Sequence, residues 1–120
     1  MHIKRNQTRL LRIKTANQIT ERSEYEILQE LKALNKTEKS ITYVQEILAD
    51  NPWAEQLREY FYQKLLSLSL NPELMEASST YLEKKPRDKL SLSYHAAAMR
   101  AEGDVTSATA TLEKLSLIHI

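Results

Sequence analysis

Residues 51–86 decide the fold of this chain, and they read NPWAEQLREYFYQKLLSLSLNPELMEASSTYLEKKP. Near the two ends of this stretch stand Pro52 and Pro86, whose positions in the chain differ by 34. Apolar residues recur at the same interval around it, for example Leu31, Leu65 and Met99. A fixed period of roughly 20–50 residues is typical of stacked helical hairpins. The sequence therefore predicts a repetitive all-α fold.

The composition excludes several other classes of protein. One glycine and three prolines in 120 residues are too few for the many turns of an all-β fold. There is no cysteine, which excludes disulfides, thiolate metal sites and cysteine catalysis. No apolar run is long enough for a transmembrane helix, and the net charge is only +1. We expect one cytoplasmic domain that spans residues 1–120.

Apolar residues follow helical rather than strand spacing along nearly the whole chain. Asn51-Pro52 and Asn71-Pro72 each place a capping residue before a proline, which favours the start of a helix. Gly103 followed by Asp104 predicts a left-handed helix stop and then a new helix cap. About seven helices are expected, over residues 6–16, 23–34, 38–49, 52–68, 72–84 and one segment on each side of Gly103.

Residues 89–120 carry the clearest form of the repeat. Leu92, Ala96 and Met99 mark the first helix, Gly103 stands in the turn, and Ala108 lies on the second helix. The glycine permits a left-handed residue between tightly packed antiparallel helices, and the small alanine lets the two helices approach closely. On these residues the chain resembles a tetratricopeptide repeat (TPR) protein. The resemblance implies antiparallel helical hairpins stacked in a short right-handed solenoid.

The same resemblance divides the chain into units. A basic N-terminal helix or half repeat takes residues 1–20, and three repeats follow at residues 21–54, 55–88 and 89–120. The second repeat departs from the family pattern. Leu74 stands where a small residue is usual, and Ser78 stands where an apolar residue is usual. We therefore expect its hairpin to pack more loosely or in a shifted register.

A binding groove is also implied by the resemblance. In the TPR family the first helices of successive repeats line a concave surface that holds an extended peptide or a partner helix. The equivalent residues here are mixed and moderately polar, which favours an amphipathic helix or an apolar strand over an acidic tail. The resemblance assigns the partner-binding groove to Tyr25, Gln29, Lys32, Glu59, Gln63, Leu66, Ser93, Ala97 and Arg100.

Both ends of the chain carry further candidate surfaces. Arg5, Arg9 and Arg12 form one cationic face of the first helix, which suits nucleic-acid phosphates, an anionic membrane surface, an acidic protein or simply solvent. The C-terminal residues form an apolar edge, and repeat arrays need a polar cap at such an edge. We expect self-association, a partner or the folded-back tail to cover it. This edge contains Leu112, Leu115, Ile118 and Ile120.

No residue pattern predicts catalysis. None of His2, His95 and His119 has a second histidine three or four positions away, so no zinc-like pair exists on one helix. A single glycine cannot build a phosphate-binding loop, and there is no Gly-x-Ser-x-Gly elbow. His95 takes the repeat position of Phe61, so we expect it to pack between helices. We expect no enzymatic activity, no cofactor and no metal.

Four aromatic residues gather in the middle of the chain. Phe61 and Tyr62 fall on the apolar stripe, the side of the helix on which the regularly spaced apolar residues lie, so we expect them in the core. Tyr60 lies off that stripe and is expected at the surface, near Trp53 in the sequence.

These observations favour a non-enzymatic protein–protein interaction module. The first hypothesis is an adaptor or small chaperone of bacterial type, whose groove holds a helix or extended segment of a partner. Stand-alone proteins of this size and repeat number resemble the small chaperones of type III secretion. A regulatory or oligomerisation domain of a transcriptional activator is an alternative, and a structural subunit of a larger assembly is another. Nucleic acid is not an expected partner.

Overall fold

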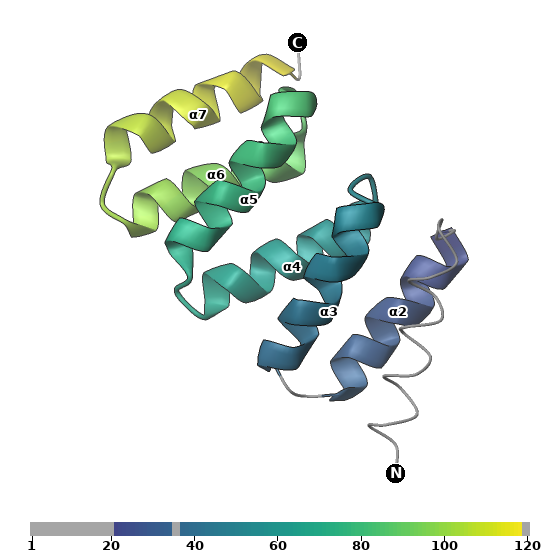
Figure 1. Cartoon of the computed structure of the whole chain (residues 1–120). Coiled ribbons are helices and arrows are strands. Elements are labelled where there is room, and N and C mark those ends of the chain that lie inside the picture. The colour runs from purple at the N-terminus through teal and green to yellow at the C-terminus, as the bar shows by residue number, and fades with distance from the viewer. Residues whose placement is uncertain (1–20, 35–36, 119–120) are drawn as a thin grey trace. The chain divides into compact units, whose positions relative to one another are not determined.

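The computed structural model describes residues 21–34 and 37–118, and the chain divides into two compact units between Phe61 and Tyr62. All regular structure in these two described ranges is helical (Figure 1). The helix expected over residues 6–16, with its basic face, lies outside them. The six described helices are α2 (Glu21–Leu34), α3 (Thr37–Asp50), α4 (Glu55–Ser67), α5 (Asn71–Lys84), α6 (Lys89–Ala101) and α7 (Val105–Ile118).

The first unit contains α2, α3 and the beginning of α4. Apolar residues three or four positions apart give a helix one apolar face, and that face becomes buried. In α2 the buried face includes Ile27 and Leu31, and in α3 it includes Val44 and Ile47. The Ser40 hydroxyl of α3 donates a hydrogen bond to the Leu31 carbonyl oxygen of α2 (3.5 Å), so the two helices are in direct contact.

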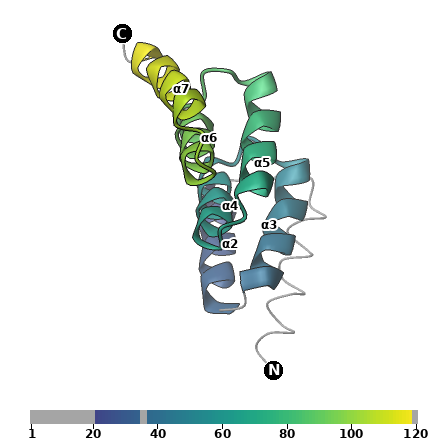
Figure 2. The same cartoon turned by 90° about the vertical axis from the view of Figure 1, so that its left-hand side faces the viewer.

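The second unit contains the end of α4 and the helices α5, α6 and α7. Helix α6 packs against both α5 and α7 (Figure 2). Tyr62 of α4 reaches α6 in two ways. Its hydroxyl lies 2.9 Å from the Ser91 hydroxyl, and its ring packs at a tilt against Tyr94, with 5.6 Å between the ring centroids. A buried tyrosine needs such a polar partner for its hydroxyl.

The helix bounds recur at the interval of the sequence repeat. Helix α5 begins and ends one repeat interval after α3, and α7 does so relative to α5. Helix α6 begins and ends the same interval after α4. The periodicity of the sequence is thus also a periodicity of secondary structure from α3 onward.

Two turns that contain proline have the same backbone hydrogen bonds. The first proline turn is residues 51–54, and the second is residues 85–88. The Ala54 amide donates to the Asn51 carbonyl oxygen in the first, and the Asp88 amide donates to the Lys85 carbonyl oxygen in the second, both at 3.1 Å. Each turn also bonds to the end of the preceding helix at 2.9 Å. Proline is the only residue type that they share at equivalent positions, so the backbone recurs where the side chains differ.

The turns after α4 and α6 recur in the same way. Ser69 has a φ of 59° and Gly103 a φ of 88°, both in the left-handed region. The next residue, Leu70 or Asp104, donates its amide to the carbonyl oxygen five positions earlier, at 2.9 Å in each case. This is a Schellman motif, which satisfies carbonyl groups at a helix end. Glycine adopts this conformation without strain, whereas serine does so at some energetic cost.

Several predicted helix starts are wrong, since α2 begins at Glu21 rather than at residue 23 and α3 at Thr37 rather than at residue 38. Helix α4 begins at Glu55 rather than Pro52, because Asn51 is bound to the end of α3, where its side-chain amide donates to the Ile47 carbonyl oxygen (3.1 Å). Helix α5 already includes Asn71, its cap position is Leu70, and no side chain caps it. The stop at Gly103 is confirmed, and Asp104 caps α7 by accepting a hydrogen bond from the Ser107 amide (3.1 Å).

The looser packing or shifted register expected for the hairpin in residues 55–88 stays a prediction, although the bounds of α5 fall at the same interval as those of α3 and α7. Leu74 and Ser78 are both completely buried. Ser78 replaces an apolar residue without leaving its hydroxyl unsatisfied, because that hydroxyl donates to the Leu74 carbonyl oxygen (2.8 Å).

Candidate functional site

The residues assigned to the partner-binding groove are all accessible within their own helices. All of them are exposed except Leu66 on α4 and Ala97 on α6, which are half-buried. They lie on the side of each helix opposite to the buried stripe, which on α2 contains Ile27 and Leu31. The largest exposed apolar surface among them belongs to Tyr25, at 59 %.

The two predicted end surfaces are only partly described. Arg5, Arg9 and Arg12 lie outside the described residues, and so does Ile120 of the apolar edge. Leu112, Leu115 and Ile118 are half-buried on α7, and Leu117 is 64 % exposed. Helix α7 therefore presents apolar side chains to solvent near its C-terminal end.

The aromatic residues divide differently from the prediction. Phe61 and Tyr62 are buried, as expected. Tyr60 is only 8 % exposed, so its prediction as a surface residue is wrong, since burial on α4 extends beyond one stripe to include Arg58 as well. Trp53, in the first proline turn, is the exposed aromatic residue of this group, at 48 %.

A buried carboxylate in the first unit escaped the sequence analysis. Glu24 of α2 is 5 % exposed, and its Oε1 accepts a hydrogen bond from the Leu57 amide (2.9 Å). Leu57 is the third residue of α4, where amides have no partner inside the helix. A carboxylate at this end is also stabilised by the helix dipole. Glu24 thus caps a helix that is distant from it in the sequence, and its role is structural.

The second unit contains a serine–histidine pair. Ser78 Oγ of α5 lies 2.7 Å from Nδ1 of His95 on α6. Such a pair is one component of nucleophilic catalysis. Here Ser78 is completely buried, so no substrate reaches its hydroxyl, and the pair joins two packed helices. Burial lowers the pKa of His95 below its usual value of 6.5. The Lys114 charge lowers this pKa further, and a hydrogen bond with the Met75 backbone opposes the shift.

The described residues contain no group of three or more histidine, aspartate or glutamate side chains that could hold a metal ion. We therefore turn to the accessible surfaces of the described residues as candidates for binding.

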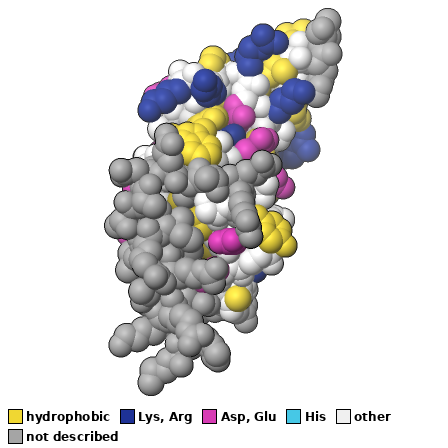
Figure 3. All heavy atoms as spheres, turned by 90° about the vertical axis from the view of Figure 1, so that its right-hand side faces the viewer, with side chains coloured by type: hydrophobic (Ala, Val, Ile, Leu, Met, Phe, Trp, Pro, Cys, Tyr) yellow, Lys and Arg dark blue, Asp and Glu magenta, His cyan; other side chains and the backbone are white. Residues whose placement is uncertain are grey.

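The most distinctive accessible surface is residues 84–89, which we name the basic turn. It contains the second proline turn and carries four exposed cations, which are Lys84, Lys85, Arg87 and Lys89. Basic side chains are numerous on the face shown in Figure 3. Asp88 is the one carboxylate in the basic turn, and its Oδ2 accepts a hydrogen bond from the Ser91 amide at the start of α6 (3.0 Å).

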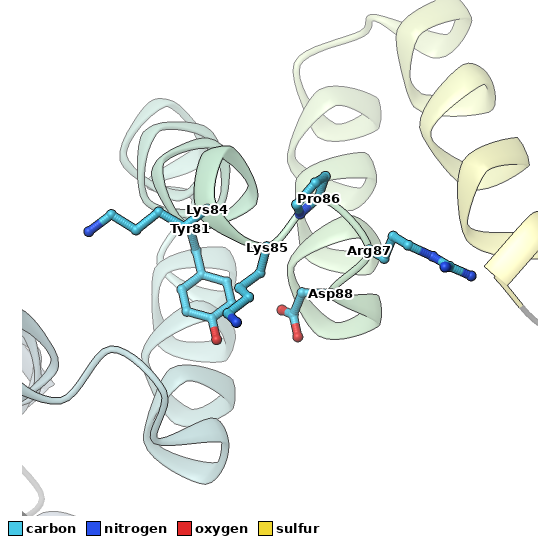
Figure 4. Close-up of a pocket in the computed structure, with 6 residues that line it drawn as sticks. All are labelled: Tyr81, Lys84, Lys85, Pro86, Arg87 and Asp88. Carbon is cyan, nitrogen blue, oxygen red and sulfur yellow. The ribbon is translucent and has the colours of Figure 1, made fainter.

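A hollow of about 390 Å³ opens at the basic turn, between the end of α5 and the start of α6. Figure 4 shows Tyr81, Lys85 and Asp88 on one side of the turn, while Lys84 and Arg87 extend in opposite directions away from it. The Tyr81 ring and Pro86 supply apolar wall, and the remaining lining residues are charged. The hollow can hold a small apolar group whose neighbours are anionic.

The sequence contains a signal for this site that the spacing argument did not use. Four cations fall within residues 84–89, a higher density than in the basic N-terminal segment. The hollow depends on how α5 and α6 pack, so residue spacing alone does not reveal it.

No helix in the described ranges has both the length and the apolar character that crossing a membrane requires. Comparisons with protein-family models, with curated proteins and with solved structures found no match to this chain.

Proposed function

We propose that this chain is a non-enzymatic protein-interaction module, an adaptor or small chaperone whose hairpins stack as a TPR-like right-handed solenoid. Its partner would lie as a helix or extended segment along the exposed sides of α2, α4 and α6. The groove residues named above would make the contacts.

One observation carries this proposal, namely the recurrence of helix bounds and turn hydrogen bonds at the interval of the sequence repeat. A repeated hairpin cannot bury its apolar face alone, and stacked neighbours bury it together. In the proposed solenoid, regular stacking would bring the same side of every first helix into line. The side chains at these positions are accessible, which a binding surface requires.

Site-specific photocrosslinking tests the proposal. A photoreactive amino acid is placed at Gln29, Gln63 or Ala97, which are equivalent positions on α2, α4 and α6. The purified full-length variants are irradiated in an extract of the source cells, and the products are identified by mass spectrometry. We expect all three positions to capture the same protein.

A matched control set lies on the other helices. Gln45, Ser79 and Glu113 are separated by the same repeat interval, and all three are exposed on α3, α5 and α7. These positions should capture no common protein. If the control set captures the same protein as efficiently, the assignment of the groove is wrong.

A second function, as an oligomerisation domain, is favoured by the exposed apolar side chains of α7, above all Leu117. Burial of such surface between chains would stabilise an oligomer. Sedimentation equilibrium over a range of concentrations should then show a reversible dimer that the Leu117→Lys variant weakens. A monomer at every concentration would remove this alternative.

A further inference from the structure

Building on the proposed function, on which this site depends, we propose that the basic turn docks an acidic segment of the partner protein, with one apolar side chain of that segment seated in the hollow beside Tyr81.

Charge is the first argument. Residues 84–89 carry four exposed cations and one carboxylate, and that carboxylate already accepts a hydrogen bond from the Ser91 amide. Like charges at close separation repel each other, and an anionic partner relieves this repulsion. Charge complementarity at an interface speeds association and fixes the docked register.

Comparison with the other proline turn shows that the backbone does not require this charge. Residues 50–55 have the equivalent positions and the same turn hydrogen bonds, yet they carry Asp50 and Glu55 and no cation. The cations of the basic turn are therefore a property of this one turn and not of the repeated fold.

The rigidity and the size of the site support docking of a peptide. Pro86 and the hydrogen bonds of Lys85 and Asp88 hold the turn, so little order has to be gained on binding. The hollow of about 390 Å³ lies within the range of roughly 300–1,000 Å³ that is typical of ligand pockets. Its Tyr81 and Pro86 walls suit an aromatic or aliphatic side chain, and the cations around it suit the flanking carboxylates.

The four cations of the basic turn lie within six consecutive residues. A nucleic acid would gain most from an extended track of phosphate contacts. An acidic peptide needs only a few contacts around one anchor, which is what residues 84–89 offer.

The experiment measures binding of a fluorescein-labelled peptide of Glu and Asp with one central Phe to the full-length chain, by fluorescence anisotropy at low salt. We expect saturable binding that weakens as salt is added, because the charges involved are exposed. The variant Lys85→Glu/Arg87→Glu should weaken it by about tenfold or more. A peptide with Ala in place of Phe, or the Tyr81→Ala variant, should show reduced affinity at high salt.

The matched control is Lys39→Glu/Lys114→Glu, which changes the net charge equally at exposed sites on α3 and α7. At physiological salt, where the Debye length is about 8 Å, its affinity should stay within about twofold of the unchanged chain, since all four cations of the basic turn are kept. Urea unfolding is measured for both double variants to check that they are folded. If Lys85→Glu/Arg87→Glu does not fold, the milder Lys85→Ala/Arg87→Ala variant replaces it.

Several results would overturn the proposal. These are the absence of saturable binding, equal weakening by both double variants, tighter binding of an RNA oligonucleotide of equal charge, or self-association that depends on the basic turn. The crosslinking experiment decides the proposed function separately. If the partner captured at the groove positions binds equally well after Lys85 and Arg87 are replaced, the proposed function stands. The basic turn is then excluded as a binding site for that partner.

Discussion

Residues 51–84 and residues 85–118 can be compared position by position, because their helices begin and end at equivalent positions of the repeat. Each segment consists of a proline turn, a helix, a Schellman turn and a second helix, and the turn hydrogen bonds are the same. The side chains that support this backbone differ. The two segments therefore share the structure of their backbone. The side chains that stabilise each segment and form its surface are different.

Helix capping shows this most clearly. The third amide of α4, from Leu57, bonds to Glu24 of another helix, whereas the equivalent amide of α6, from Ser91, bonds to Asp88 in the adjacent turn. Ala54 stands at the position of Asp88 and has no side-chain acceptor to offer. One segment thus takes its cap from a distant helix and the other from its own sequence.

The largest effect is expected from Glu24→Ala, which removes the distant cap. The free energy of unfolding should fall by about 1–3 kcal/mol, because the buried Leu57 amide loses its acceptor. Urea denaturation measures this difference. Glu24→Gln keeps an acceptor oxygen and should recover much of the loss, and Glu59→Ala, at an exposed position of α4, should change stability by less than about 0.5 kcal/mol. Equal effects of Glu24→Ala and Glu59→Ala would show that the distant cap is unimportant.

Asp88→Ala breaks the local cap and should lower stability by about 1 kcal/mol. Hydrogen exchange should show faster exchange of the Ser91 amide, with little change at Leu57. Asp88→Asn retains a good capping side chain and serves as the control. Unchanged exchange at Ser91 in the alanine variant would contradict a role for Asp88 as a cap.

The two Schellman turns can be compared directly by exchanging the residues that adopt the left-handed backbone conformation. Ser69→Gly should stabilise the chain and Gly103→Ser should destabilise it, each by roughly 0.5–1 kcal/mol, because only glycine adopts this conformation without strain. A Cβ atom at Gly103 meets no other atom within 4 Å, so backbone strain alone is tested there. Thermal unfolding measures both variants, and a shift of the same sign in both would refute the argument.

The smallest expected effect is a pH dependence of the free energy of unfolding, which arises within residues 85–118. Burial lowers the pKa of His95 in the folded state below the value of 6.5 that it has when exposed. Between these two pKa values the unfolded chain therefore binds more protons than the folded chain. The stability that His95 contributes is complete above pH 6.5 and is lost as pH falls. His95→Phe introduces the residue at the equivalent position of α4 and should flatten the dependence. Urea denaturation at several pH values gives the slope, which would stay unchanged if His95 were not involved.

Helical content was the most predictable part of the structure. The repeated apolar spacing identifies every described helix. The helix ends at Leu34 and Lys84, and the turn at Gly103 after α6, follow from local signals. The starts of α4 and α5 were misplaced, because Asn51 bonds backward to α3 and Asn71 lies inside its helix. Local capping rules do not contain that tertiary information.

The sites were less predictable for the same reason. The burial of Tyr60 and the role of Glu24 depend on which helices become neighbours, and apolar spacing does not report this. The basic turn can be seen in the sequence as a cluster of charge, but its hollow arises only when α5 and α6 pack. The nine groove residues are accessible, and their function stays a prediction that crosslinking can test.

The hydrogen bond from Leu57 to Glu24 also bears on the order in which the chain folds. It joins groups 33 positions apart, so the first turn of α4 is completed only after α2 has formed and docked. The matching hydrogen bond at α6 joins residues only three positions apart. Local contacts form sooner than distant ones because they close shorter loops. We therefore expect the beginning of α6 to gain protection from exchange earlier during refolding than the beginning of α4.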